Sequence, residues 1–230
     1  DVYKRQIWNL RYADATTFPG LILWAGSVAG PLAPPGTYTV RVSAHGLTKT
    51  REVVVRRDVR VTGVSDEDLR RQFELASEIH RKVSAANAAV IRIRHLKSQI
   101  DERARQAGTG SSRGRGISAA AAPLTAALTA IEGEIYQWRN QSSQDPLNYP
   151  IKLNNKLAAL QSVVESADAP PTSQAKAVFE VLTARLDAEL AKLEAVVARD
   201  LAAFNRLLRR QGLPPVESPT AEQPVAGGGI

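Results

Sequence analysis

Histidine is the side chain best suited to bind a metal ion or to transfer a proton near neutral pH, and the chain has three. His45 falls in a predicted turn between two strands, where we interpret it as a tolerated turn residue. His80 and His95 fall on one predicted helix, about 22 Å apart along its axis, so they cannot share a metal ion. The chain also has no cysteine. We therefore expect no metal site and no cofactor.

Carboxylates are the next candidates, either as metal ligands or as an acid–base pair. Asp66, Glu67 and Asp68 stand at the predicted start of a helix, where negative charge suits the helix dipole, so we interpret them as capping residues. Glu132 and Glu134 are two positions apart and diverge by about 200° around a helix. No serine-centred nucleophile elbow has a histidine placed to serve it. We expect no catalytic residue in this segment, which argues against an enzyme.

Positive charge is the remaining candidate, since the formal net charge is +7. Arg70, Arg81, Arg92 and Arg103 recur every 11 residues and therefore line one face of a predicted helix. A polyanion-binding groove is one interpretation, but acidic residues share that helix, so we favour a solvated face and expect no nucleic-acid partner. The glycine-rich stretch 108–116 lacks the lysine of a phosphate-binding loop and is interpreted as a connection between helices.

Residues 7–64 show the alternation of apolar and polar residues that is typical of strands. The stretch 37–58 contains two such runs around a turn at His45–Gly46 and is predicted to form a hairpin. Two earlier runs, Ile-Trp-Asn-Leu-Arg-Tyr-Ala and Gly-Leu-Ile-Leu-Trp-Ala-Gly, are also predicted as strands. An Ig-like sandwich usually has about seven strands, so four strands indicate a truncated one.

From Ser65 onward the apolar residues recur at steps of three or four, the period of a helix. Four helices are predicted, two long and two shorter: 65–106, 119–140, a third of about 18 residues that includes Leu153–Val164 and stops at Pro170–Pro171, and 172–211. Together they predict an antiparallel helical bundle over residues 65–212, with the two shorter helices stacked against the long pair. Residues 213–230 are rich in proline, glycine and polar residues and are predicted to form a disordered tail. No stretch approaches the roughly 20 apolar residues of a membrane span.

The first six residues, Asp-Val-Tyr-Lys-Arg-Gln, match the translation of a transposon end that is used to tag sequencing libraries. We interpret residues 1–6 as an adapter scar, with a natural mature N-terminus as the alternative. The absence of methionine fits the first interpretation. On that interpretation, authentic sequence begins near Ile7, inside a domain.

Two motifs carry a resemblance to a known family. Trp8–Tyr12 reads Trp-Asn-Leu-Arg-Tyr, and Ala33–Val40 reads Ala-Pro-Pro-Gly-Thr-Tyr-Thr-Val. They resemble an Ig-like module, similar to that of flagellar hook-capping proteins, in bacterial exported β-propeller proteins of the sortilin type or with BNR repeats. These proteins are often labelled glycosyl hydrolases or sialidase-like. The run Glu134–Leu157 is similar to the helical region that closes such chains. The sequence has no BNR Asp-box, and with it lacks the candidate catalytic surface of the family.

The residues and the resemblance together predict an α+β chain in two segregated parts, a truncated Ig-like β-sandwich (7–64) and an antiparallel helical bundle (65–212). The resemblance implies export to the periplasm or the extracellular space. It also implies a non-catalytic C-terminal module that packs on its own N-terminal propeller or holds a protein partner. The alternative is an accessory domain of a propeller glycoside hydrolase whose active site lies in the N-terminal part. A polyanion-binding helical domain is a third, weaker hypothesis.

Overall fold

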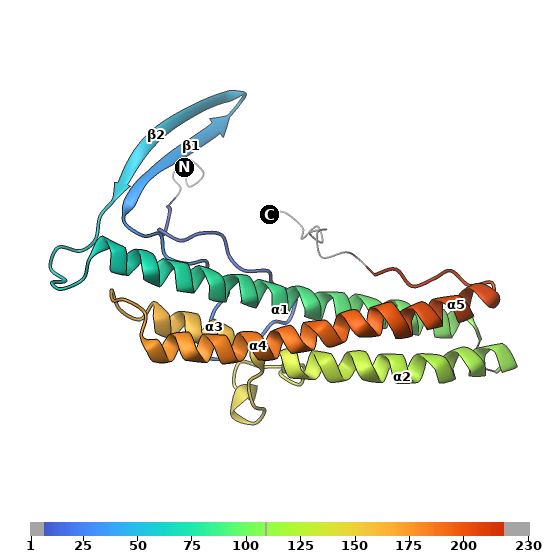
Figure 1. Ribbon diagram of the computed structural model, residues 1–230. Helices are drawn as coiled ribbons and strands as arrows, with labels where there is room; N and C mark the ends of the chain where they lie inside the picture. The colour runs from blue at the N-terminus through green and yellow to red at the C-terminus, as the bar shows by residue number, and fades with distance from the viewer. Residues whose placement is uncertain (1–6, 109, 219–230) are drawn as a thin grey trace.

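The computed structural model describes residues 7–108 and 110–218 as a long helical bundle from which a two-stranded hairpin projects (Figure 1). The predicted adapter scar, residues 1–6, lies outside the described residues. The elements follow in the order β1 (Gly36–Ala44), β2 (Leu47–Val55), α1 (Asp66–Gln106), α2 (Ser112–Ile135), the 3-10 turn η2 (Asp145–Leu147), α3 (Leu153–Val164), α4 (Ser173–Val196), the π-helical turn η3 (Val197–Leu201) and α5 (Ala202–Arg210).

The helices form the predicted bundle. Helix α1 is one long rod, and α4, η3 and α5 follow one another without a break as a second (Figure 1). The shorter α2 and α3 both run in the opposite direction and together cover the length of the long pair (Figure 1). Apolar residues at helical spacing fill the centre, and the fully buried ones include Ile79, Ile93, Leu128, Leu157 and Leu186. The prediction of two long and two shorter helices is confirmed, but α3 ends at Val164, before the predicted stop at Pro170–Pro171.

The helix starts follow from local capping. Ser65 accepts a hydrogen bond from the backbone N–H of Asp68, and the Asp68 carboxylate accepts one from the backbone of Ser65, so the predicted capping role is confirmed. Helix α2 starts at Ser112, earlier than predicted, because Ser111 caps it by accepting from the N–H of Gly114. A Cβ on Gly114 would lie 1.7 Å from the carbonyl oxygen of Gly108, so this close approach requires glycine. Most of the predicted loop 108–116 is therefore helical.

The predicted hairpin is confirmed. β1 and β2 pair antiparallel over their full length, from Gly36 opposite Val55 to Ala44 opposite Leu47. His45 and Gly46 both have positive φ, 49° and 76°, as a two-residue type I′ turn requires. The described sheet contains these two strands alone. A two-stranded hairpin is marginally stable in water, so its support must come from what it contacts.

The prediction of strands within residues 7–35, here named the N-terminal strap, is wrong. Within it, Arg11 and Leu32 form an isolated bridge, and the rest runs as extended chain along the helices. Leu10 and Ala25 have φ of 61° and 54°, in the left-handed region that interrupts a strand. Of the predicted half-sandwich, the described chain therefore contains the hairpin, while the strap packs on the bundle and buries Phe18 in the helical core.

Polar side chains of the helices bind the backbone of the strap. The Asn155 side chain accepts from the N–H of Trp24 (2.8 Å) and donates to the carbonyl of Trp24 (2.7 Å). The Tyr136 hydroxyl donates to the carbonyl of Gly20 at 2.9 Å, which draws Tyr136 out of α2 and ends that helix before residue 140, where the prediction placed its end. These bonds supply the partners that a neighbouring strand would otherwise provide.

Residues 213–218, here named the C-terminal strap, differ from the predicted disordered tail because they lie along α1 and α5. The Asn205 carboxamide bonds both backbone groups of Val216, at 2.9 and 2.7 Å, and the Gln99 carboxamide bonds both backbone groups of Glu217, at 2.8 and 2.9 Å. Val216 is buried against the core. The remainder of the predicted tail, residues 219–230, lies outside the described residues. No helix in the described ranges combines the length and apolar character needed to cross a membrane.

Candidate functional site

The three histidines lie on different parts of the chain and in different environments. His45 is at the tip of the hairpin, and His95 is exposed on α1. His80 is half-buried under the N-terminal strap, and this burial lowers its pKa, although the negative charge of Asp14 partly opposes the effect. Among residues 7–108 and 110–218, no group of three or more histidine or acidic residues is placed to hold a metal ion. The histidines therefore define no common site.

Glu132 and Glu134 bond to different partners, as their predicted divergence requires. Glu132 is buried and accepts from Arg94 (2.8 Å) and Lys97 (3.1 Å) of α1. The Arg94 guanidinium also lies over the rings of two residues that anchor the N-terminal strap, Phe18 and Tyr136. This cluster joins α1, α2 and the strap, which is a structural role because both cations already neutralise the carboxylate.

The acidic residues at the start of α1 are engaged locally. Glu67 pairs with Arg70 and Arg71 on its own helix, and Asp66 pairs with Arg57 from the chain that follows β2. Hydrogen bonds from Ser65 lower the pKa of Asp68. The three carboxylates therefore stabilise the first turn and its entry.

Three of the four arginines of the predicted basic stripe on α1, Arg70, Arg92 and Arg103, bond to other groups of the chain. Arg92 pairs with Glu194 and donates to Ser218, while Arg103 donates to the backbone carbonyls at Pro214 and Pro215. The C-terminal strap thus lies over part of the stripe. This arrangement gives Arg92 and Arg103 a structural role.

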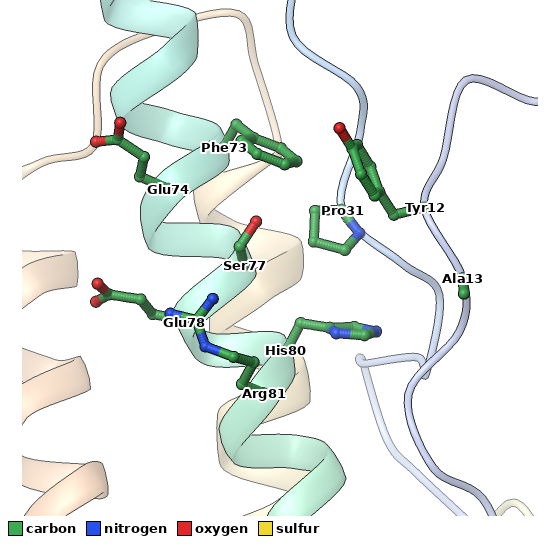
Figure 2. A pocket seen from close by; sticks show the side chains of 9 residues that line it. All are labelled: Tyr12, Ala13, Pro31, Phe73, Glu74, Ser77, Glu78, His80 and Arg81. Atoms are coloured by element: carbon green, nitrogen blue, oxygen red, sulfur yellow. The ribbon is translucent and has the colours of Figure 1, made fainter. Parts of the chain in front are cut away.

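A shallow groove of about 490 Å³ lies between α1 and the N-terminal strap (Figure 2). Tyr12 and Pro31 of the strap face Phe73 and His80 of α1 across it, and the Tyr12 and Phe73 rings contact with centroids 5.0 Å apart. Within the described residues, the Nε2 atom of His80 is buried and has no hydrogen-bond partner, so His80 Nε2 does not bond to Ser77, the hydroxyl on the groove wall. The groove is mostly apolar, and Glu74, Glu78 and Arg81 of α1 also line it (Figure 2).

A second groove, of about 550 Å³, lies where the π turn η3 faces α2. Pro123 and Leu124 form one wall and Phe204 the other, and the ion pair between Arg199 and Asp200 lies at the rim. Sequence periodicity did not indicate the π turn, because its flanking helices continue the same apolar stripe. Asp200 is the one carboxylate among the described lining residues, and its pairing with Arg199 occupies it.

The hairpin carries exposed apolar residues, more of them on one side of the ribbon than on the other, where Val54 lies. Its register places Tyr38, Val40, Val42, Leu47 and Val53 on one side of the ribbon with Lys49 and Arg51, and these seven residues are named the hairpin face. Val42 is 58% exposed and Leu47 72% exposed. At the base of this face, the ring of Trp8 meets the ring of Tyr38 edge-on, with centroids 5.4 Å apart. The face therefore begins as a packed aromatic cluster and continues as uncovered aliphatic residues.

Exposed β-branched residues on a protruding ribbon favour protein contact, because each loses unfavourable contact with water when it is covered. The sequence signal for this surface was the alternation itself, which predicts that one side is covered without naming what covers it. Comparison with protein-family models, curated proteins and solved structures gives no match. The candidate site is therefore defined by geometry alone, as an exposed apolar surface on the hairpin.

Proposed function

We propose that this chain is a non-catalytic structural and interaction module, in which the helical bundle holds the β-hairpin so that the hairpin face can dock on another protein surface. The observation that carries this proposal is the contrast between the two parts. The candidate carboxylates of the bundle are paired within the chain, whereas the hairpin exposes Val42 and Leu47 to water.

The bundle is built as a platform for extended chain. Asn155 bonds both backbone groups of Trp24, so the segment that leads into the hairpin is fixed before β1 begins. Tyr38 strengthens the base of the hairpin by donating its hydroxyl to the carbonyl of Pro34 at 2.7 Å. A rigid base with an exposed outer half is what a docking element needs, because pre-organisation lowers the entropic cost of binding.

A more specific form of the proposal, here called its finer form, follows from the resemblance of the sequence to exported β-propeller proteins. In that form, the module closes an exported β-propeller protein and packs on the propeller or on a protein partner. The exposed hairpin face supports it, because a propeller or other β surface would supply the missing cover. The alternative is an accessory domain of a propeller glycoside hydrolase, with the reaction carried out by residues of the propeller.

The source genome tests this proposal. A reading frame that continues upstream of the codon for Ile7 into β-propeller repeats supports it, and a start codon directly before that residue contradicts its finer form. Within a propeller, two carboxylates about 5 to 10 Å apart in the folded protein would favour the glycoside hydrolase alternative. A propeller without such a pair, in a protein that cleaves no glycoside, would exclude that alternative.

A further inference from the structure

We infer that the hairpin face binds a β-sheet surface that presents carboxylates among apolar residues, on a protein partner and not on a second copy of this chain. This inference rests on the proposed docking role of the hairpin and adds the chemistry of the partner. It is carried by the register of the two strands and by the charges that this register places on one side.

The register separates the charges of the hairpin by side. Val40 lies opposite Arg51 and Val42 opposite Lys49, so both cations share the face with the exposed valines. The acidic residue of the ribbon, Glu52, alternates to the other side. In the described ranges neither Lys49 nor Arg51 forms an ion pair with a carboxylate, although Arg51 donates to the neighbouring carbonyl of Thr50. The hairpin face is therefore apolar and positive.

The surroundings reinforce this charge. Residues 36–60 contain six Lys and Arg against two Asp and Glu. Two of these arginines, Arg57 and Arg60, are paired with Asp66 and Asp58 at the base. The outer part, where Lys49 lies, has no such neutralisation within the described residues, so the unpaired positive charge sits beside the exposed aliphatic residues.

These charges argue against a second copy. Face-to-face packing of two copies would bring two Lys49 and two Arg51 side chains into one interface, where the face supplies no carboxylate. Like charges placed opposite one another destabilise a sheet contact, and their burial adds a desolvation cost. A partner sheet with carboxylates at the corresponding positions removes both costs.

Apolar packing argues against a nucleic acid. Trp8 already covers Tyr38 at the base of the face, which shows which side of the ribbon takes an apolar layer. Val42 and Leu47 continue that layer outward. A phosphate backbone bound here would either leave these side chains exposed to water or lose its own hydration without an apolar contact in return. A second sheet packed about 10 Å away would cover them with its own apolar side chains.

Two matched probes test the inference with the full chain. Both are disulfide-closed β-hairpin peptides of identical sequence, with valines on one side, except that one has glutamate and the other lysine between the valines. Calorimetric titration should give roughly tenfold or greater preference for the glutamate peptide, because two attractive cross-sheet pairs replace two repulsive ones. The preference should shrink between 50 and 200 mM salt.

Charge reversal supplies the internal control. The double variant Lys49→Glu with Arg51→Glu should reverse the preference, while Arg41→Glu, on the other side of the ribbon, should leave it unchanged. All three residues are exposed, so far-UV circular dichroism should match that of the parent chain. A third variant, Val42→Asp, should weaken both peptides.

Each other outcome overturns the inference in a distinguishable way. Equal binding of both peptides, lost in Val42→Asp, would refute the charge preference and leave the proposed docking role intact. Binding of neither peptide at about 1 mM would refute the partner chemistry, while the genomic test of the proposed function would stand separately. Concentration-dependent dimers abolished by Leu47→Asp would identify a second copy as the occupant. Single-stranded DNA that displaces the glutamate peptide and binds Val42→Asp equally well would identify a polyanion.

Discussion

Asn155 offers the sharpest test of how the bundle holds the N-terminal strap. Its carboxamide, buried in the first turn of α3, forms two hydrogen bonds of 2.8 and 2.7 Å with the backbone of Trp24. Asn155→Leu keeps the approximate volume and removes both bonds. Each bond contributes about 0.5–1.5 kcal/mol, and the abandoned backbone groups add a desolvation cost, so we expect a loss of about 2–3 kcal/mol.

This cost has a ceiling, because the strap can leave the bundle and regain hydrogen bonds to water. The loss should therefore show as local opening as well as in the free energy of unfolding. Urea denaturation followed by circular dichroism measures the second quantity. Hydrogen exchange of the Trp24 amide measures the first and should accelerate roughly 30-fold for a local loss of about 2 kcal/mol.

Asn148→Leu is the matched control, because Asn148 is exposed after η2 and has no side-chain bond to the strap. The two hydrogen bonds from Asn155 to Trp24 are here named the carboxamide clamp. If both variants lose the same free energy of unfolding within about 0.5 kcal/mol, and hydrogen exchange at Trp24 is unchanged, the carboxamide clamp does not hold the strap on the bundle. Faster exchange over the strap with an unchanged exchange rate in α1 would instead confirm that the clamp acts locally.

Three further predictions concern the helices that hold the hairpin. Ser65→Ala should lower the free energy of unfolding, measured by urea denaturation, by about 1 kcal/mol. The pKa of Asp68 is lowered in the folded chain. The contribution of Asp68 to stability should therefore be present above about pH 4 and be lost as the pH falls below that value. Gly26→Ala should destabilise the folded chain by about 1–3 kcal/mol, since the new Cβ would lie 2.7 Å from the α3 backbone. Gly116→Ala is the control: open space surrounds Gly116, so the substitution should stabilise α2 by about 0.5–1 kcal/mol. Glu132→Gln should cost about 1–3 kcal/mol in thermal or urea unfolding, because it leaves two cations without their carboxylate; an unchanged midpoint would contradict the structural role of this cluster.

The hairpin and the bundle were predictable because their signals are local. His45–Gly46 supplies the two positive φ values of a type I′ turn, and Ser65 with Asp68 forms a capping box within four residues. The repeat of apolar residues at three and four positions gives helix number and length without knowledge of what packs on them. Such patterns determine an element from its own residues.

The straps were not predictable in the same way. The alternation around Trp8 predicts that one side of the segment is covered. It does not distinguish cover by a second sheet from cover by the surface of a helical bundle. The signal that could have decided lies in the helices, where Asn87 and Asn155 interrupt apolar stripes and turn out to be buried, each bonded to the strap backbone. A carboxamide among core positions of a helix indicates an extended segment nearby, because a buried amide requires a polar partner.

The candidate site was predictable only in part. Alternation from Tyr38 outward placed apolar residues on one side of the hairpin, and the turn at His45–Gly46 sets the register that adds Lys49 and Arg51 to that side, but neither names what covers it. The basic stripe of α1, by contrast, looked like a surface feature in sequence. It is engaged because Arg92 and Arg103 hold the C-terminal strap, a contact between residues more than 100 positions apart.

Hydrogen exchange of the hairpin amides tests the central claim most directly. The experiment compares β1 and β2 in the 230-residue chain with the same strands in the longer polypeptide that the proposed function expects, read by peptide-level mass spectrometry. If the hairpin face is a docking surface, its amides should exchange at least about tenfold more slowly in the longer polypeptide, while amides in the centre of α1 stay unchanged. Equal exchange of the hairpin in both would show that nothing covers this face and would contradict its role as an interaction surface.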